Sequence, residues 1–264
     1  MSSRASTARV PGMGMLRETG KLFALGLDVA RGIFQRPFQV REFIQQSWFI
    51  ASVTILPTAL VAIPFGAVIS LQFGSLARQL GAQSYTGAGS VLATVQQASP
   101  LVTALLVAGA GGSAICADIG ARTIREEIDA MEVLGVSAVQ RLIVPRVLAC
   151  MLVALLLNGM VSVIGVLGGY FFNVVLQDGT PGAYLASFSA LAQLPDLWVG
   201  ELKALIFGFI AAVVAAYRGL NPPPGPKGVG DAVNQSVVIT FLLLFVVNFV
   251  ITLIYLQVVP AKLD

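Results

Sequence analysis

The residues best able to do chemistry in this chain are the charged ones between Asp118 and Arg146, where carboxylates and guanidinium groups alternate with apolar side chains. Their types favour ion pairs over bond-making. The sequence of 264 residues has no histidine, which removes Ser-His and Cys-His nucleophile pairs and zinc-protease motifs. Cys116 and Cys150 lie in apolar stretches without ligand-type spacing. We therefore predict no catalytic residues, no cofactor and no metal, and a protein that is not an enzyme.

The stretch from Ala121 to Gly135 is predicted to be a short amphipathic helix ended by its glycine. Opposite charges stand four residues apart in two pairs: Arg122 with Glu126, and Arg125 with Asp129. The apolar residues at helical spacing are Ile124, Ile128, Met131 and Leu134. Such a helix is shaped to dock in a groove on another protein. The alternative is a solvated helix that rests on its own bundle.

The elements that must position this helix are membrane spans. A mean hydropathy of +0.85 with 56% hydrophobic and 11% charged residues lies outside the range of water-soluble domains. A span needs about 20 predominantly apolar residues. Five segments qualify, at about 48–71, 101–119, 146–176, 202–217 and 233–259. The first is expected to be kinked by Pro57 and Pro64. The fold class is therefore an all-α integral membrane protein.

Basic residues predict the orientation of these spans, because they favour the cytosolic side. With the N-terminus inside, the cytosolic side receives Arg4, Arg9, Arg17, Lys21, Arg31, Arg36, Arg41, Arg122, Arg125, Arg141, Arg146, Arg218 and Lys227. The other side receives only Arg78, Lys203 and Lys262. We predict a multi-pass protein of the inner (plasma) membrane with an extracytoplasmic C-terminus. The net charge of +3 then marks cytosolic flanks and does not indicate nucleic acid.

The segment before the first span divides the chain into residues 1–47 and a membrane domain of residues 48–264. Leu16–Trp48 mixes apolar and basic residues, which fits an amphipathic helix in the inner headgroup layer, interrupted near Pro37. An ordinary cytosolic helix packed on the bundle fits equally well.

Several segments together resemble the MlaE/YrbE family of permeases. They are the run from Ser99 to Ala114, Ala117-Asp-Ile-Gly120, Glu126-Glu-Ile-Asp-Ala-Met-Glu-Val-Leu-Gly135 and Val144-Pro-Arg146. Arg36-Pro-Phe-Gln-Val-Arg-Glu-Phe43 and Ala121–Ala130 are similar to actinobacterial, including mycobacterial, YrbE subunits of the A type from Mce lipid transport systems. The resemblance extends more weakly over nearly the whole chain.

The resemblance implies that the segment Glu126–Gly135 is a coupling helix, between the second and third spans, that binds a cytosolic ATPase. The residues expected in or beside this contact are Arg122, Arg125, Glu126, Glu127, Asp129, Met131, Glu132 and Leu134. The implied partners are a cytosolic ABC ATPase dimer, a second YrbE permease chain in a heterodimer, extracytoplasmic Mce lipid-shuttling proteins and a lipid substrate. Import is the implied direction.

The chain departs from proteobacterial relatives at Ala110, where they carry Arg, and at Gln96-Gln-Ala-Ser99, where they carry acidic and basic residues. A less polar pocket favours fatty acids, mycolic-type lipids or sterols over a phospholipid. The lipid pathway is expected between the first, second and fifth spans near their outer half, lined by Leu71, Leu76, Leu80, Leu101 and Leu105.

Two other classes of function were weighed. An autonomous secondary transporter or channel would place several charged residues deep in the spans, and the predicted spans have none. A membrane scaffold for lipid-binding proteins would show the same small-residue helix contacts. No Gly-x-x-x-x-Gly-Lys-Ser/Thr loop is present, so a transporter of this type needs an ATPase on another chain.

Overall fold

The computed structural model describes residues 13–35, 39–81, 86–176, 179–191 and 194–258, and no strand occurs among them. Five stretches of helix are long and apolar enough to cross a membrane: Val40–Gln79, Gly87–Ile124, Val139–Leu176, Leu194–Leu220 and Pro226–Val258. This confirms the predicted all-α integral membrane protein with five spans.

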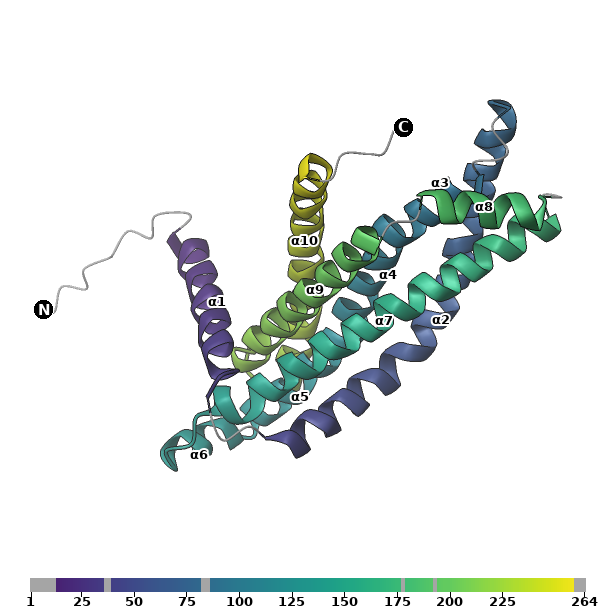
Figure 1. The fold of residues 1–264 in the computed structure, drawn as a ribbon. Helices are drawn as coiled ribbons and strands as arrows, with labels where there is room; N and C mark the ends of the chain where they lie inside the picture. The colour runs from purple at the N-terminus through teal and green to yellow at the C-terminus, as the bar shows by residue number, and fades with distance from the viewer. Residues whose placement is uncertain (1–12, 36–38, 82–85, 177–178, 192–193, 259–264) are drawn as a thin grey trace, which may run out of the picture.

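The long helices α2 (Val40–Gln79), α7 (Val144–Phe171) and α9 (Leu194–Leu220) run side by side along the length of the molecule (Figure 1). The helix α10 (Pro226–Val258) packs on α9 and on α5 (Ser113–Ile124), and its outer part leans away from the other spans. The short helix α6 (Glu127–Val133) lies at one end of the bundle. At the opposite end α3 (Thr86–Leu92) packs on α8 (Pro181–Leu191).

The spans are longer than predicted at most of their ends. The first begins at Val40 instead of Trp48, the second at Gly87 instead of Leu101, and the fourth at Leu194 instead of Leu202. The predicted spans end at charged or turn-forming residues. A helix continues through such residues when neighbouring groups form hydrogen bonds with their polar atoms. Pro57 and Pro64 lie inside one continuous helix, α2, which curves along its length (Figure 1).

Wider π-helical turns interrupt two of the spans. In the second span, η2 (Ala93–Ala98) and η3 (Val107–Gly112) alternate with α3, α4 (Ser99–Leu106) and α5. In the third, η4 (Val139–Ile143) and η5 (Phe172–Leu176) flank α7. A π turn leaves backbone carbonyls free of their usual partners and is frequent at functional sites.

Small residues bring α2 and α7 into direct backbone contact. A methyl group on Gly66 would lie 2.5 Å from the carbonyl oxygen of Gly165, so glycine is required there. Ser70 adds a hydrogen bond of 2.8 Å to the carbonyl oxygen of Gly169. Gly165 and Gly169 thus form a close contact between the two helices, as small residues do in membrane proteins.

The N-terminal helix α1 (Met13–Gly32) packs on the bundle through one face. Leu25 and Val29 are buried in the main core, and Gly26 lies against Val213 of α9. The opposite face exposes apolar residues, including Phe23. The helix ends at Gly32 and α2 begins at Val40, whereas Pro37, near which the interruption was predicted, lies outside the described residues.

Candidate functional site

The segment predicted as one helix from Ala121 to Gly135 is two helices joined by a sharp turn. α5 ends at Ile124, and Glu126 takes a left-handed backbone conformation with φ 58° before α6 begins. A left-handed residue other than glycine costs about 1 kcal/mol. The turn breaks the helical register, so the predicted pairs Arg122 with Glu126 and Arg125 with Asp129 do not form.

The end of α6 follows the prediction. Gly135 has φ 74°, its backbone N–H donates to the carbonyl of Glu132 at 2.9 Å, and the N–H of Val136 donates to Met131 at 2.9 Å. These two bonds form a Schellman motif, in which a left-handed glycine closes the last turn of a helix. Gly135 therefore fixes where the chain turns back toward η4.

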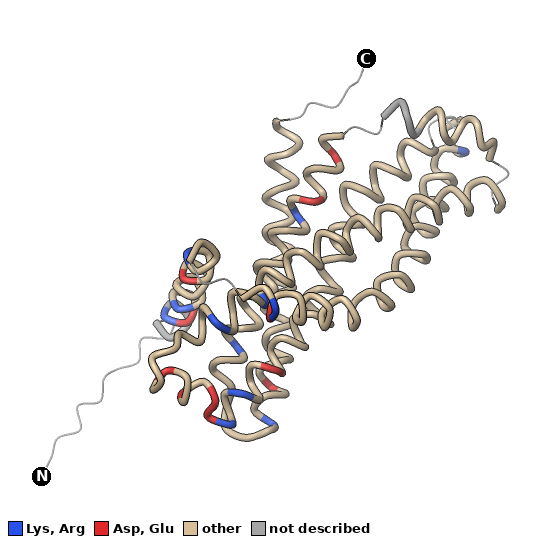
Figure 2. Tube along the Cα trace, turned by 60° about the horizontal axis from the view of Figure 1, so that its bottom comes forward, with Lys and Arg blue, Asp and Glu red and all other residues tan. Residues whose placement is uncertain are grey.

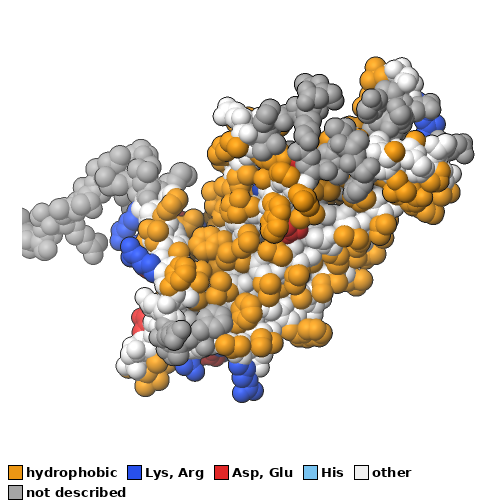
Figure 3. Space-filling model, viewed as in Figure 1, with side chains coloured by type: hydrophobic (Ala, Val, Ile, Leu, Met, Phe, Trp, Pro, Cys, Tyr) orange, Lys and Arg blue, Asp and Glu red, His pale blue; other side chains and the backbone are white. Residues whose placement is uncertain are grey.

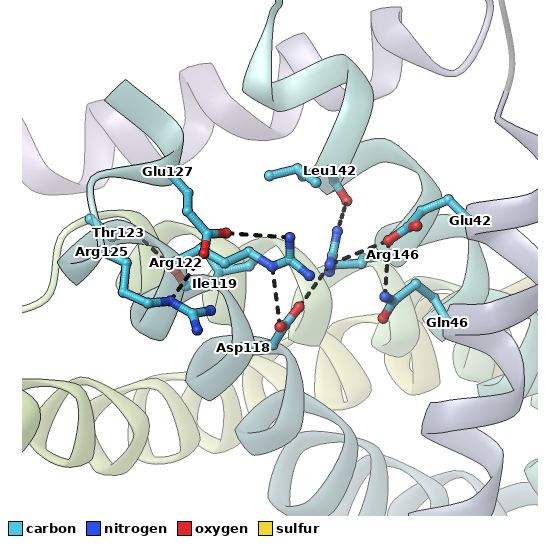
Figure 4. Close-up of polar contacts among 10 residues, drawn as sticks. All are labelled: Glu42, Gln46, Asp118, Ile119, Arg122, Thr123, Arg125, Glu127, Leu142 and Arg146. Carbon is cyan, nitrogen blue, oxygen red and sulfur yellow. Dashed lines mark hydrogen bonds and ion pairs between the residues drawn. The ribbon is translucent and has the colours of Figure 1, made fainter. Parts of the chain in front are cut away.

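A network of ion pairs replaces the predicted helical pairs (Figure 4). It joins three guanidinium groups to three carboxylates: Arg122, Arg125 and Arg146, with Glu42, Asp118 and Glu127. Oε1 of Glu127 on α6 lies 3.0 Å from Nε of Arg125, and its Oε2 lies 3.7 Å from Nη1 of Arg122. Arg122 in turn lies 3.2 Å from Asp118. These pairs tie the start of α6 to α5.

Arg146 extends the network from α5 to α7 and α2. Its Nη2 lies 2.7 Å from Oδ2 of Asp118 and 3.3 Å from Oε1 of Glu42. The side-chain amide of Gln46 also donates a hydrogen bond of 3.0 Å to Oε1 of Glu42. Its Nη1 donates to the carbonyl oxygen of Leu142 in η4 at 2.8 Å. The Arg146 side chain is 1% exposed. A buried guanidinium with two carboxylates in reach holds three helices in a fixed relation.

Figure 2 shows that charged residues gather at this end of the bundle. The predicted docking residues divide into two groups. Glu126, Asp129, Glu132 and Leu134 are exposed, the last by 78%. Glu127, Arg122 and Arg125 belong to the network, and Met131 packs against the core beside the buried Ile128. Val133, which the sequence did not single out, is 87% exposed. The free face of α6 is thus acidic with two apolar side chains at its tip.

A second polar cluster lies at the other end of the spans, where α9 carries Asp196, Glu201 and Lys203 within its first turns. Lys203 is 2% exposed, and its Nζ donates to the carbonyl oxygen of Gln96 at 3.3 Å and to Thr252 at 2.9 Å. Lys203 therefore lies inside the bundle and not on an outer loop.

Neighbouring side chains complete this cluster. Asp196 accepts hydrogen bonds from Gln96 at 2.8 Å and from Tyr255 of α10. Glu201 accepts from Asn158 at 3.1 Å. Asn158 also accepts from Ser99 at 2.9 Å, so this asparagine forms hydrogen bonds across helices. The sequence signal for this cluster is the group of three charged residues, Asp196, Glu201 and Lys203, within eight positions of one helix.

The residues predicted to line a lipid pathway do not lie together. Leu101 and Leu105 border an apolar pocket of about 190 Å³ between α2, α4 and α10, with Phe65 and Phe241 on its other walls. Leu71, Leu76 and Leu80 are exposed along the outer part of α2 and its end, and they do not line that pocket. The pocket itself lies between the first, second and fifth spans.

These features define a multi-pass helical membrane protein with a network of ion pairs at one end of the bundle and an exposed, acidic helix between its second and third spans. Residues 43–254 match the family model described as Permease MlaE. The chain therefore belongs to the MlaE permease family.

Two relatives cover nearly the whole chain. A probable ABC transporter permease protein of Rickettsia bellii is 30% identical over 92% of this chain and 94% of its own length. One of Synechocystis is 30% identical over 90% of this chain and 88% of its own. The chloroplastic protein TRIGALACTOSYLDIACYLGLYCEROL 1 of Arabidopsis thaliana is 28% identical over 73% of this chain and 55% of its own length. The chain is thus a permease of an ABC transporter, which works with an ATPase and further transporter components.

Proposed function

We propose that this chain is the non-catalytic permease half of an Mce-type lipid importer, closest to actinobacterial YrbE subunits of the A type. A second, different YrbE chain completes the lipid pathway, and a separate dimer of ABC ATPases drives it. The observation that carries this proposal is α6, whose acidic free face ends in the exposed side chains of Val133 and Leu134. A short helix of this kind fits an apolar groove with a basic rim.

The ion network supports a route by which such a contact moves the spans. Glu127 on α6 connects through Arg122 and Asp118 to Arg146 on α7, and Arg146 reaches Glu42 at the start of α2. Movement of α6 on ATP binding is therefore passed to α2. The same helix carries Phe65 into the apolar pocket beside Leu101 and Leu105, so a shift of α2 changes the pocket.

The pocket is the proposed start of the lipid pathway, and Leu71, Leu76 and Leu80 continue it along the outer part of α2. Its lining is almost wholly apolar, as an acyl chain or a sterol requires. One relative is named for trigalactosyldiacylglycerol, and this also favours a lipid. Ala110 and Gln96-Gln-Ala-Ser99 favour a fatty acid, mycolic-type lipid or sterol. By resemblance, Mce proteins deliver this lipid on the extracytoplasmic side.

The proposed topology places residues 1–47 and α6 in the cytosol, with α1 as an interfacial helix, and residues 48–264 as the permease domain in the inner membrane. Gathering of charge around α6 and α1 (Figure 2) supports this orientation under the positive-inside rule. The C-terminus is then extracytoplasmic.

Co-purification from the native membrane tests the proposal. The tagged chain is expected to bring down an ABC ATPase and a second permease chain. Glu132→Lys, on the free face of α6, is expected to lose the ATPase and keep the second permease. Asp231→Lys makes the same change at an exposed acid on α10 and is expected to keep both. The proposal fails if the wild type brings down no ATPase in mild detergent, or if Glu132→Lys and Asp231→Lys behave alike.

A further inference from the structure

Three hollows between α1, α9 and α10 join into one continuous depression. The first, of about 380 Å³, is bordered by Phe23 and Leu27 of α1, Phe209 and Val213 of α9, and Leu243 and Val247 of α10. It shares Thr19, Leu22 and Val214 with a second hollow of about 450 Å³. The second shares Arg218 and Ile239 with a third, which also reaches Asn234 and Gln235. The depression is therefore apolar at one end and polar at the other.

The polar end is arranged around Arg218. Its Nε is buried and has no hydrogen-bond partner among the described residues. Its Nη2 lies 3.3 Å from the exposed carboxylate of Glu18, and the guanidinium lies 5.8 Å from the centre of the Tyr217 ring. The exposed amides of Asn234 and Gln235 border the same hollow. A guanidinium with an unsatisfied N–H beside amide donors suits a phosphate group.

The apolar end opens among exposed apolar side chains of α1 and α10. Phe23 and Leu27 on α1 are exposed, and so are the neighbouring side chains of α10 outside the depression. In Figure 3 apolar side chains gather between α1 and the main bundle. The arrangement matches an amphiphile that lies with its charged group at the end of α9 and its chain along α9 and α10.

We propose that this depression binds one phospholipid of the adjacent leaflet, with the phosphate on Arg218 and one acyl chain between α1 and α10. The lipid fixes α1 against α9. This site is separate from the pocket of Leu101 and Leu105, and the inference does not rest on the lipid transport proposed above. The Glu18 carboxylate beside Arg218 adds a place for the ammonium group of a zwitterionic headgroup.

Native mass spectrometry of the detergent-purified transporter tests the proposal. The wild type is expected to retain one phospholipid for each copy of this chain after detergent exchange. Arg218→Gln removes a charge-assisted hydrogen-bond donor, so delipidated protein should bind added phosphatidylethanolamine about tenfold more weakly. Diacylglycerol, which has the acyl chains but carries neither a phosphate nor any charge, is expected to bind wild type and Arg218→Gln equally. Equal phospholipid affinity in both proteins would overturn the assignment of Arg218.

A matched pair of substitutions tests the apolar end. Leu27→Trp fills the depression, whereas Leu242→Trp places the same side chain on the exposed face of α10 that does not border it. Only Leu27→Trp is expected to lower phospholipid retention, with both variants eluting as the intact complex. Leu105→Trp, in the other pocket, is expected to retain the phospholipid even if it abolishes transport. Equal retention in Leu27→Trp and Leu242→Trp would contradict the site.

A photo-crosslinker at Phe23 identifies the occupant directly. In the assembled transporter in its native membrane, p-benzoylphenylalanine at this position is expected to form an adduct with the mass of a phospholipid. An adduct with a polypeptide would show that a membrane helix of another subunit fills the depression, and it would overturn the proposal.

Discussion

The two ends of the bundle hold their buried cations in different ways. At the end near α6, Arg146 contacts two carboxylates and a carbonyl oxygen. At the other end, Lys203 contacts only a carbonyl and a hydroxyl, with no carboxylate in ion-pair distance among the residues that the structure describes. Lys203 also donates charge-assisted bonds, but ion pairs with carboxylates add the attraction of full opposite charges and the forked geometry of a guanidinium. We therefore expect the end near α6 to be the stiff end of the bundle and the end near Lys203 to be the looser end.

The largest difference is expected from removing the cation at each end. Arg146→Met leaves Glu42 without a counter-charge and Asp118 with Arg122 alone, so the free energy of unfolding should fall by about 3 kcal/mol. The measurement is the unfolding transition of the purified chain in detergent. Arg146→Lys keeps the charge but loses the forked geometry, and it should recover only part of the loss. A full recovery would show that charge alone matters at this end.

Glu42→Gln removes one charge from the stiff end while it keeps a hydrogen-bonding group of the same size. We expect a loss of about 1 kcal/mol in the free energy of unfolding. Because Glu42 is the link to α2, lipid transport for each ATP hydrolysed should also fall in the reconstituted transporter. Gln46→Glu at the neighbouring position of the same helix is a control for altered charge there. Unchanged coupling in Glu42→Gln would contradict the route through α2.

Lys203→Met makes at the looser end the change that Arg146→Met makes at the stiff end. An apolar side chain of similar length replaces a buried amine with neutral partners, and such replacements are often neutral or stabilising. We expect the free energy of unfolding to change by less than about 1 kcal/mol. A loss as large as that of Arg146→Met would remove the contrast between the ends.

Arg125→Gln should have the smallest effect. Arg125 pairs with Glu127 at 3.0 Å, but its side chain is 63% exposed, and exposed pairs contribute about 0.5 kcal/mol or less. The same unfolding measurement should place this variant near the wild type. A loss above 1 kcal/mol would mean that the pair holds the turn between α5 and α6.

Hydropathy was sufficient to predict the five spans, because the bilayer requires long apolar helices. It could not locate their ends: α9 continues through the charged residues Asp196, Glu201 and Lys203, because each of them has a hydrogen-bond partner on another helix. The helices α3 and α8 were missed for a related reason. They are short, and they are stabilised by packing on each other. One such contact is a hydrogen bond of 3.2 Å between the hydroxyl groups of Ser90 and Tyr184.

The candidate site was predictable where its chemistry is local. Gly135 ended the helix as expected, since a left-handed glycine is a local signal. The pair of Asp118 and Arg122 is also local, because the two residues stand four apart on one helix. The turn at Glu126 and the pairing of Arg146 with Glu42 depend on residues far apart in sequence, and no spacing rule connects positions 42, 118 and 146.

The most direct test of the account is the contact made by the tip of α6. A photo-crosslinker at Leu134, which is 78% exposed, should form an adduct with the ABC ATPase in the native membrane, whereas one at the buried Ile128 should not. This result would place α6 in the groove of the ATPase. An adduct from Leu134 with lipid, or only with this chain itself, would contradict the coupling role of α6.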